Sequence, residues 1–512
     1  MTIALWRAAA LGLGIGLTCV SASAQSAPAP MPPTIAAARD EAYPGTITLD
    51  VDVSDVARGI FRVRETIPVS GPGPITLFYP QWLPGNHAPR GPINHLAGIE
   101  ISANGARIPW RRDAVNMYAF HVDVPAGVSA IEARFQFLSP TAGNQGRIVA
   151  TPELLNLQWN TVVLYPAGHY VSRIRIAPSV TLPEGWSFAA ALDGASTHGQ
   201  VTRFAETDLM TLVDSPMFAG RHARRVELAP NARTRVTLNL FADRADQLEA
   251  SEDQLRPHRE LVRQAYRLFG SHHYDHYDFL FGLSDRLSGI GLEHHRSSEN
   301  AVGAGFFTDW DEHLDDRELL PHEVVHSWNG KFRRPADLWT ADYNTPMRNS
   351  LLWVYEGQTQ YWGHVLTARS GLWNRQDALD SLAHTAAIYD TRIGRNWRAL
   401  GDTTNDPIVS LRRPQPWRSW QRSEDYYSEG LLIWLDADTL IRERSNNRRS
   451  LDDFARAFFG GGDGSSTVST YTFEDVVAAL NAVQPYDWAA FLRARVEAVA
   501  AYEGVAFGEV RL

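Results

Sequence analysis

The chain contains a single cysteine, Cys19, among its 512 residues. Cys19 lies in an apolar N-terminal stretch that we expect to be removed from the protein. The mature chain is therefore predicted to have no disulfide bond, no thiol nucleophile and no thiolate metal ligand. Any bound metal would have to be held by nitrogen and oxygen atoms.

An excess of positive charge is also absent. The chain has 48 Lys and Arg against 58 Asp and Glu, which gives a formal net charge of −10, and it has no basic tail. This balance argues against nucleic acid as a partner, and an acidic protein also lacks attraction to anionic membranes. The composition, 44% hydrophobic and 11% aromatic, is typical of a globular protein with sizeable cores. The length predicts roughly two to four domains.

The chain has no apolar run of the length that a transmembrane helix needs. Residues 1–24 contain Arg7, an apolar core at 8–20 and the small-residue sequence Ala-Ser-Ala at 22–24. Because this core is too short to cross a bilayer, we predict a signal peptide cleaved after Ala24, a periplasmic or secreted protein, and no membrane anchor afterwards. The Pro- and Ala-rich residues 25–43 predict a flexible linker. The oligomeric state stays open.

From residue 44 to about 240 the sequence alternates between apolar and polar residues, as in ITLDVDV at 47–53, with Gly, Pro and Asn turns between these runs. This pattern predicts an N-terminal antiparallel β domain. His87 and Arg90, in LPGNHAPR, could line a cleft, but turn residues on the rim of a sheet are the commoner explanation.

Helical periodicity begins near Asp253, in DQLRPHRELVRQAYRLFG, with Gly270 at the position of a C-cap. The next residues, SHHYDHYD, could suggest a second metal site. A polar loop is the preferred interpretation, because these histidines have no common face. From Leu431 onward the pattern predicts a C-terminal helical domain at 431–512.

The stretch PHEVVHSW at 321–328 is hard to explain without a metal. His322 and His326 are four residues apart, so on a helix both imidazoles can bind one Zn²⁺. Glu323 could take a proton from a water on the metal without being a ligand, as in HExxH metallopeptidases. Pro321 implies that the helix begins there or is kinked. The alternative is that this pentapeptide arose by chance.

A catalytic zinc needs three protein ligands and one open position. Glu356, in LLWVYEGQTQYWGHVL, is the best candidate for the third, because a carboxylate in so apolar a helix is costly unless it is paired or metal-bound. His364, two turns further on, is a rival ligand. Asp337 and Asp342, in the connecting loop, are weaker candidates.

These residues resemble the glycyl aminopeptidase family of zinc metallopeptidases, relatives of the thermolysin-like gluzincins. The resemblance rests on HEVVHSWNGKFRRP and LLWVYEGQTQYW, and YPQWLPGNHAPR, GIGLEHHRSS and DYYSEGLLIWL agree in order. It implies a multidomain α+β protein with an N-terminal antiparallel β domain at 44–240, a thermolysin-like α/β catalytic domain at 241–430 and the C-terminal helical domain at 431–512. It also implies one zinc per chain, held by His322, His326 and Glu356.

The resemblance implies two further roles. Glu293, in the segment GIGLE at 289–293, would bind the α-amine of the substrate, as a glutamate in a G-x-x-E segment does in related aminopeptidases, and Gly291 would let the backbone approach the ligand. Glu299 is a weaker candidate for the amine. Tyr427 would donate a hydrogen bond to the developing oxyanion, with Tyr426 as the alternative. The acidic residue at 429 departs from the lysine more usual in the family.

The predicted function is zinc-dependent removal of N-terminal residues, small ones such as Gly or Ala, from peptide substrates, with Glu323 as general base. One alternative is an endopeptidase, which would need an open cleft and no carboxylate for the amine. Another is a secreted peptide-binding protein with an idle zinc site. A structural zinc site would have no use for Glu323, which speaks against this second alternative.

Overall fold

A computed structural model describes residues 28–230, 234–413 and 415–499. The predicted signal peptide, including Cys19, lies outside the described residues. The chain divides into a short unit, Met1–Thr34, and a compact unit, Ile35–Leu512, and the architecture below is that of the second. Within the described ranges, no helix has both the length and the apolar character that a membrane span requires.

The predicted linker at 25–43 ends earlier than expected, because its last residues pair with the β domain. Arg39 forms a parallel bridge with His169, and the main-chain N–H of Tyr43 donates to the carbonyl of Arg173 at 2.9 Å. A composition rich in Pro and Ala gave no sign of this pairing, since it depends on a segment more than a hundred residues away.

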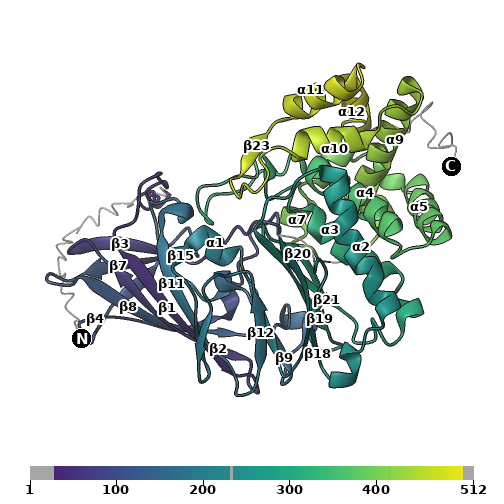
Figure 1. The fold of residues 1–512 in the computed structure, drawn as a ribbon. Coiled ribbons are helices and arrows are strands. Elements are labelled where there is room, and N and C mark those ends of the chain that lie inside the picture. The colour runs from purple at the N-terminus through teal and green to yellow at the C-terminus, as the bar shows by residue number, and fades with distance from the viewer. Residues whose placement is uncertain (1–27, 231–233, 414, 500–512) are drawn as a thin grey trace, which may run out of the picture. The chain divides into compact units, whose positions relative to one another are not determined.

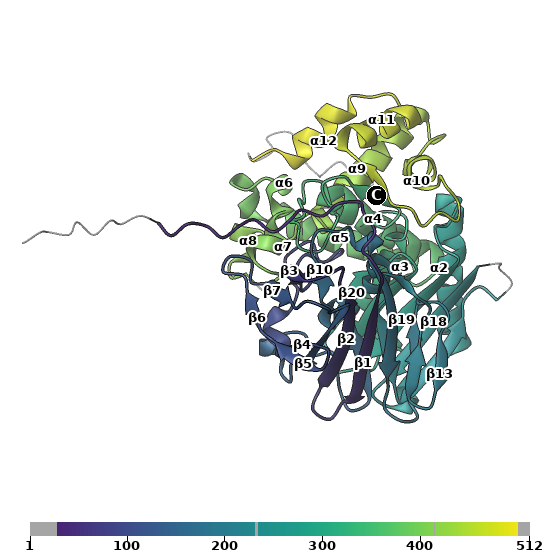
Figure 2. The ribbon, with the colours of Figure 1, turned by 90° about the vertical axis from the view of Figure 1, so that its left-hand side faces the viewer.

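The first domain is built on a nine-stranded sheet with the path β13-β14-β11-β1-β2-β8-β4-β5, and β15 pairs with β11. Its strands are β1 (Thr46–Asp55), β2 (Ile60–Pro68), β4 (Leu96–Ala103), β5 (Ala106–Ile108), β8 (Ala130–Leu138), β11 (Arg175–Thr181), β13 (Ser196–His198), β14 (Val201–Arg203) and β15 (Thr207–Asp208). Strands β1 and β2 run antiparallel and side by side (Figure 2). The pair β1 and β11 is parallel, which a long connection permits and a hairpin does not.

A second sheet of the first domain has the order β10-β3-β7-β6. Its strands are β3 (Gly73–Phe78), β6 (Trp110–Arg112), β7 (Ala119–Val124) and β10 (Tyr165–Pro166), and the short helix α1 (Leu209–Val213) follows later in the chain. One hydrophobic core contains side chains from both sheets. Burial alternates residue by residue along β2, which is why the period of two could be recognised in the sequence.

A small three-stranded sheet, in the order β12-β16-β9, joins the two domains. Its strands are β9 (Leu154–Leu157), β12 (Ser187–Ala190) and β16 (Met217–Gly220). Leu154, Ala189 and Phe218 from these strands pack with Phe241 and Leu280 of the next sheet in a separate small core.

The second domain contains a five-stranded sheet in the order β17-β18-β19-β21-β20. Its strands are β17 (His222–Glu227), β18 (Arg235–Ala242), β19 (His276–Leu283), β20 (Ile290–Glu293) and β21 (Ser297–Val302). Strands β18, β19 and β21 are parallel, and β20 lies antiparallel at one edge. The predicted domain boundary at 240 falls inside β18, because the alternating pattern continues across both sheets and does not show where one ends.

Helices α2 (Glu252–Phe269), α3 (Leu319–Val325) and α4 (Leu352–Ser370) pack with β18 and β19 around one core. Figure 1 shows α2 and α3 beside this sheet. Ser251 caps the start of α2, with Gln254 completing a capping box, and Gly270 ends the helix in the left-handed conformation (φ 74°). The prediction of a helix ending at Gly270 is therefore confirmed.

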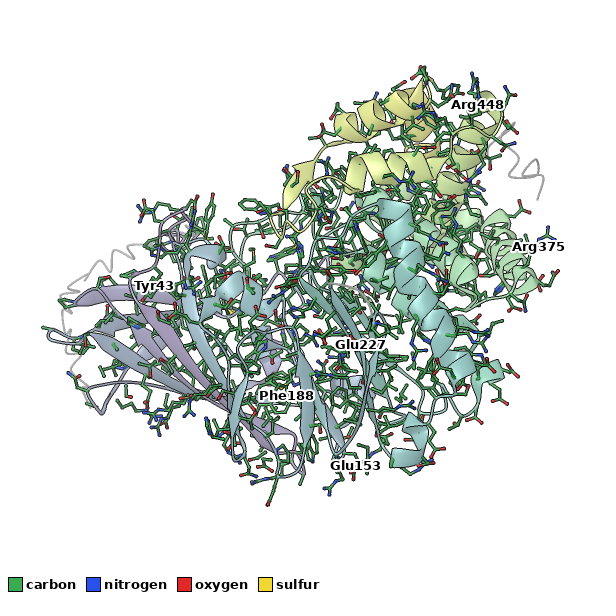
Figure 3. All side chains as sticks on the ribbon, in the orientation of Figure 1. Tyr43, Glu153, Phe188, Glu227, Arg375 and Arg448 are labelled. Carbon is green, nitrogen blue, oxygen red and sulfur yellow. The ribbon has the colours of Figure 1, made fainter. Side chains whose placement is uncertain are left out.

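The remaining elements are mostly helical. They are α5 (Arg375–Asp390), α6 (Leu400–Thr403), α7 (Asp406–Val409), α8 (Arg418–Gln421), α9 (Ser428–Ser445), α10 (Leu451–Phe459), α11 (Phe473–Val483), α12 (Trp488–Val496) and the parallel strand pair β22 (Arg333–Pro335) and β23 (Ser469–Tyr471). Charged side chains such as Arg375 and Arg448 point outward from this region (Figure 3). A β domain, a mixed α/β middle and a helical C-terminal region confirm the predicted multidomain α+β class.

Candidate active site

The helix that carries the HExxH sequence is short. It begins at Leu319, so Pro321 is its third residue, and it ends at Val325 with His326 as the C-cap. Proline is tolerated there because the first N–H groups of a helix have no intrahelical acceptor. The helix therefore neither starts at Pro321 nor needs a kink there.

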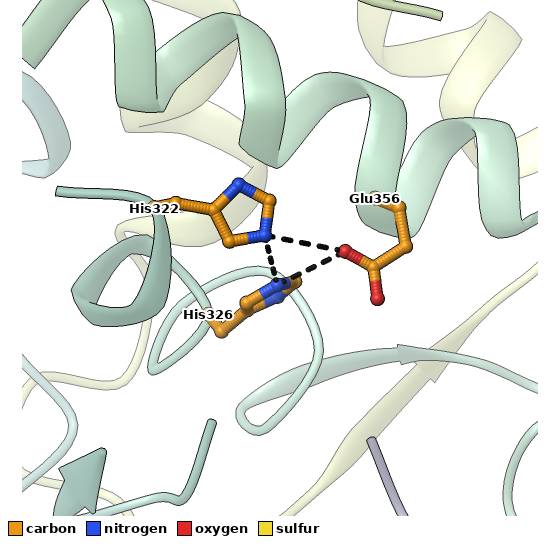
Figure 4. Close-up of side chains that lie close together, drawn as sticks. All are labelled: His322, His326 and Glu356. Atoms are coloured by element: carbon orange, nitrogen blue, oxygen red, sulfur yellow. Dashed lines mark hydrogen bonds and ion pairs between the residues drawn. The ribbon is translucent and has the colours of Figure 1, made fainter. Parts of the chain in front are cut away.

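His322, His326 and Glu356 meet at one point (Figure 4). The two Nε2 atoms are 3.1 Å apart, and Glu356 Oε2 lies 3.1 Å from His326 Nε2 and 3.4 Å from His322 Nε2. Tetrahedral ligands at zinc, with bonds of about 2.0–2.1 Å, are about 3.3 Å from one another. Two imidazoles and one carboxylate with this spacing fit one zinc ion.

The surroundings of these residues also suit a metal. His326 Nδ1 lies 2.9 Å from the carbonyl oxygen of Asn329 and donates to it, which leaves Nε2 facing Glu356. Glu356 Oε2 is buried without an aligned hydrogen bond, and so is Oε2 of Glu323. Buried carboxylate oxygens of this kind are costly unless a cation or a water satisfies them.

Glu323 lies beside the three candidate ligands and is 5% exposed. Burial is the main cause that raises the pKa of its carboxyl, to about 7, and the imidazoles of His322 and His326 oppose this shift. Gly291, on the edge strand β20, lies against the same carboxylate: a Cβ there would be 2.4 Å from Glu323 Oε1. Because Gly291 has no side chain, the carboxylate of Glu323, the predicted base, can occupy this space.

Glu293, at the end of β20, is also buried and accepts a hydrogen bond from the hydroxyl of Tyr355. Ligand atoms of Glu293, Glu323 and His326 all lie within 4.8 Å of one another. Burial raises the pKa of Glu293, but the charges of His326 and Lys331 outweigh it and lower the pKa below its usual value. An ionised carboxylate therefore stands next to the candidate base and metal ligands.

Tyr427 lies close to α3, with its ring centroid 6.0 Å from that of His322. Its hydroxyl accepts a hydrogen bond from Arg412 Nη2 at 3.2 Å, which leaves its own proton available to a ligand. Burial raises the pKa of Tyr427 well above its usual value, so the hydroxyl stays protonated. A pocket of about 570 Å³ is lined by His322, Glu323, Gly291 and Tyr427, but Tyr426 does not line it.

Two glycines bring Tyr427 to this position. Gly357 on α4 follows Glu356 directly, and Gly430 lies in the first turn of α9, whose N-cap is Tyr427. A Cβ on Gly357 would lie 2.9 Å from Cα of Gly430, so the two helices cross closely because neither residue has a side chain.

Two family models match the chain. The M61 glycyl aminopeptidase model matches residues 315–433, and the Peptidase M61 N-terminal domain model matches residues 48–221. The chain belongs to the M61 glycyl aminopeptidase family. It is a zinc metallopeptidase of the aminopeptidase type, which confirms the family and enzyme class predicted from the sequence.

Solved structures share the fold of this M61 peptidase. An aminopeptidase N family protein from Idiomarina loihiensis has a TM-score of 0.75 at 18% identity, over 89% of this chain and 76% of its own. A mutant M1 zinc metallopeptidase from Deinococcus radiodurans, bound to a Tyr-Ser-Ala substrate, has a TM-score of 0.51 at 13% identity, over 92% of this chain and 97% of its own. Native yeast LTA4 hydrolase has a TM-score of 0.52 at 13% identity, over 87% of this chain and 67% of its own. No curated protein sequence matches significantly.

The weaker ligand candidates have other partners in this M61 peptidase. His364 Nδ1 is 2.5 Å from Glu318, Asp337 accepts a hydrogen bond from Ser350, and Asp342 accepts from the backbone of the turn that follows it. The three histidines of SHHYDHYD have different neighbours, and His276 begins β19; Asp275 and His276 lie near Asp193, with possible ligand atoms of all three within 4.8 Å of one another.

Glu299, the weaker candidate for the amine, belongs to a buried charge network behind Glu293. His294 bridges Glu299 and Asp214 at 3.1 and 3.2 Å, and Lys331, the only lysine in the sequence, lies 2.9 Å from Asp214. Burial lowers the pKa of His294, but hydrogen bonds to the two carboxylates outweigh it and raise the pKa to about 9. A larger cavity of about 860 Å³ borders this network, and His322, His326 and Glu356 are not among the residues that line it.

Glu429 stands where the resemblance leads us to expect lysine. It is 3% exposed, and Arg422 and Arg395 both form ion pairs with it. The acidic residue is therefore compensated by two neighbouring guanidinium groups, which the sequence around Tyr427 alone did not reveal.

His87 is the main residue of the site that the sequence analysis did not assign. It is 1% exposed, and its Nε2 lies 2.5 Å from Glu356 Oε1, so it is not a turn residue on a sheet rim as preferred above. The only signal in the sequence was a histidine in a Gly- and Pro-rich loop, which occurs in many surface turns.

Proposed function

We propose that this protein removes small N-terminal residues, Gly or Ala, from peptides in the periplasm or outside the cell, using one zinc ion held by His322, His326 and Glu356. The observation that carries the proposal is the convergence of three candidate zinc ligands and two further buried carboxylates, those of Glu323 and Glu293, in one place. A family described as glycyl aminopeptidases supports the preference for small residues.

Zinc, when bound by such a ligand set, lowers the pKa of water and polarises a carbonyl group. Glu323 would take the proton of the attacking water and later pass it to the leaving amine. Burial raises the pKa of this carboxyl, which favours a group that can both accept and release a proton. Tyr427 would donate its hydroxyl proton in a hydrogen bond to the oxygen that gains charge as water attacks.

Glu293 would fix the register of the substrate. Its carboxylate lies within 4.8 Å of atoms of Glu323 and His326, and the α-amine and the scissile carbonyl carbon of a first residue are only two bonds apart. An ammonium group bound to Glu293 would therefore leave the first peptide bond in front of Glu323. This is the geometry of an exopeptidase.

The test compares free and N-acetylated peptides on the wild-type protein and on Glu293→Gln, which keeps the shape of the side chain but removes its charge. We expect kcat/KM for the free peptide to fall by about 10²-fold or more, because a partner of a desolvated charge pair is lost. Acetylation should cause a similar loss in the wild type and little more in the variant, since both changes remove one interaction.

Glu299→Gln is the matched control, because Glu299 is a buried carboxylate on the neighbouring strand with other partners. It should not alter the ratio of free to acetylated substrate. Equal cleavage of both substrates by the wild type would replace this proposal with an endopeptidase. Zinc binding without turnover of any substrate would instead favour a peptide-binding protein.

A panel of aminoacyl anilides tests the side-chain preference. The loop before His87 packs closely on the amine site: a Cβ on Gly85 would lie 2.7 Å from Glu293 Oε2. We expect Gly and Ala derivatives to be the best substrates, and a preference for large residues would exclude this part of the proposal. Size analysis of the exported protein tests cleavage after Ala24.

A further inference from the structure

The candidate metal site includes a side chain from the first domain. His87 and Glu356 are 269 positions apart in sequence, yet Nε2 of one lies 2.5 Å from Oε1 of the other. Both side chains are almost fully buried, at 1% and 2% exposure. Because a carboxylate can only accept, Nε2 of His87 carries the proton of this hydrogen bond.

The surrounding contacts hold His87 in place. Its main-chain carbonyl accepts a hydrogen bond from Asn349 Nδ2 at 2.9 Å, and its ring packs edge-on against Tyr355 at 5.0 Å between centroids. Its backbone is in the left-handed region, with φ 53°. Residues other than glycine adopt this conformation rarely, and His is among those that tolerate it best.

We propose that His87 is a positioning residue for zinc. Its Nε2–H holds Oε1 of Glu356, so that Oε2 alone faces the Nε2 atoms of His322 and His326. The third ligand would then bind through a single oxygen whose direction is fixed by a hydrogen bond from the first domain. The zinc site of this protein is therefore completed across the domain boundary, and the second domain by itself lacks one of its supports.

The geometry contains one competing interpretation, in which His87 is itself a ligand. Atoms of His87, Glu293 and Glu356 lie within 4.8 Å of one another, so they could surround a second cation. Two features favour the positioning role. The Nε2–Oε1 distance of 2.5 Å leaves no room for an ion between these two atoms, and Glu293 already accepts a hydrogen bond from Tyr355.

Two substitutions separate the hydrogen bond from the backbone. Asn tolerates the left-handed conformation well, but its side chain reaches only as far as Nδ1 of histidine. Gln reaches about as far as Nε2 and can donate, but it is less suited to this backbone. His121→Asn is the matched control, because His121 Nε2 lies 2.8 Å from Asp113 Oδ2 in the same domain, in a pair without candidate zinc ligands.

The experiment measures the dissociation constant of zinc by competition with a chromophoric chelator, on metal-free protein of each variant, together with metal content and thermal unfolding. We expect His87→Asn to weaken zinc binding about 10- to 100-fold, the usual effect of losing a partner that orients a ligand. His87→Gln should stay within a few-fold of the wild type, and His121→Asn should match it.

Three outcomes would overturn the proposal. If His87→Asn binds zinc as tightly as the wild type, the hydrogen bond does not contribute to zinc binding. If His87→Gln binds zinc weakly while His87→Asn binds it tightly, the loss of affinity comes from the backbone conformation and not from the hydrogen bond. Two zinc ions in the wild type and one in His87→Asn would make His87 a ligand. Because the readout is metal binding, the result is independent of which peptide bond is cut. A wild type without zinc would instead refute the proposed function.

Discussion

Gly291→Ala should displace the proposed general base without touching any metal ligand. The added Cβ would lie 2.4 Å from Glu323 Oε1 and 2.7 Å from Leu319 Cδ1, whereas ordinary contacts begin at 3.4 Å. Gly291 has ordinary strand backbone within β20, so alanine causes no conformational strain of its own. The carboxylate therefore has to retreat by about 1 Å. A misplacement of this size costs about 10²-fold in rate.

The assay is kcat with a glycyl anilide, together with zinc content. Gly289→Ala is the matched control: it adds the same methyl group beside the same strand, where the nearest atom, the carbonyl oxygen of Ala301, is 3.4 Å away. We expect the control to keep wild-type kcat within about two- to threefold, because that is ordinary contact.

A double-mutant test isolates the cause. If Gly291→Ala acts through the carboxylate of Glu323, it should cost about 10²-fold in the wild type and little in a Glu323→Gln background. Equal losses in both backgrounds, or equal kcat for the alanine variants of Gly291 and Gly289, would refute the reasoning. If Gly291→Ala loses zinc, its lower kcat comes from disturbed metal ligands and not from a displaced base.

Three further predictions concern other parts of the molecule. Glu323→Gln should retain zinc but lose at least about 10²-fold in kcat, whereas Glu356→Ala should lose zinc. If both variants lose zinc to the same extent, the roles of general base and metal ligand are wrongly assigned. Tyr427→Phe should lower kcat by about 10²- to 10³-fold with zinc retained, whereas Tyr426→Phe should not, because Tyr426 lies outside the pocket. A larger loss of kcat in Tyr426→Phe would make Tyr426 the oxyanion donor. His294, whose folded pKa is raised from 6.5 to about 9, should contribute about 3 kcal/mol of stability that is fully present below pH 6.5 and is lost as the pH rises through 9. Denaturant unfolding at pH 6 and pH 9.5 should therefore show a smaller pH dependence for His294→Gln, and an unchanged one would exclude this imidazolium as its source.

Local patterns predicted a large part of the fold. Alternation in the first domain, the C-cap signal at Gly270 and the buried character of α4 can all be recognised in short stretches of sequence. The same locality explains why the predicted boundary at 240 falls inside β18. A strand has the same pattern in either sheet, and only the pairing of β18 with β19 assigns it to the second domain.

The candidate site shows the same division between local and distant information. The spacing of His322 and His326 is a property of one helix turn, so a pentapeptide was enough to propose both as ligands. The partner of Glu356 Oε1 comes from a loop 269 positions away, and nothing within that loop distinguishes His87 from a surface histidine. Only the packing of the two domains does so.

The residues that fix the geometry of the site are, to a large extent, glycines. A Cβ on Gly291 would collide with Glu323, one on Gly85 with Glu293, and one on Gly357 with the backbone of α9. Each of these positions sets how close a backbone comes to a reactive side chain or to a neighbouring helix. A search for reactive residue types identifies the side chains that do the chemistry, but it passes over positions whose contribution is the absence of a side chain. The distances between Glu323, Glu293 and Tyr427 therefore depend on residues with no reactive side chain, and substitutions there should alter kcat without removing any functional group.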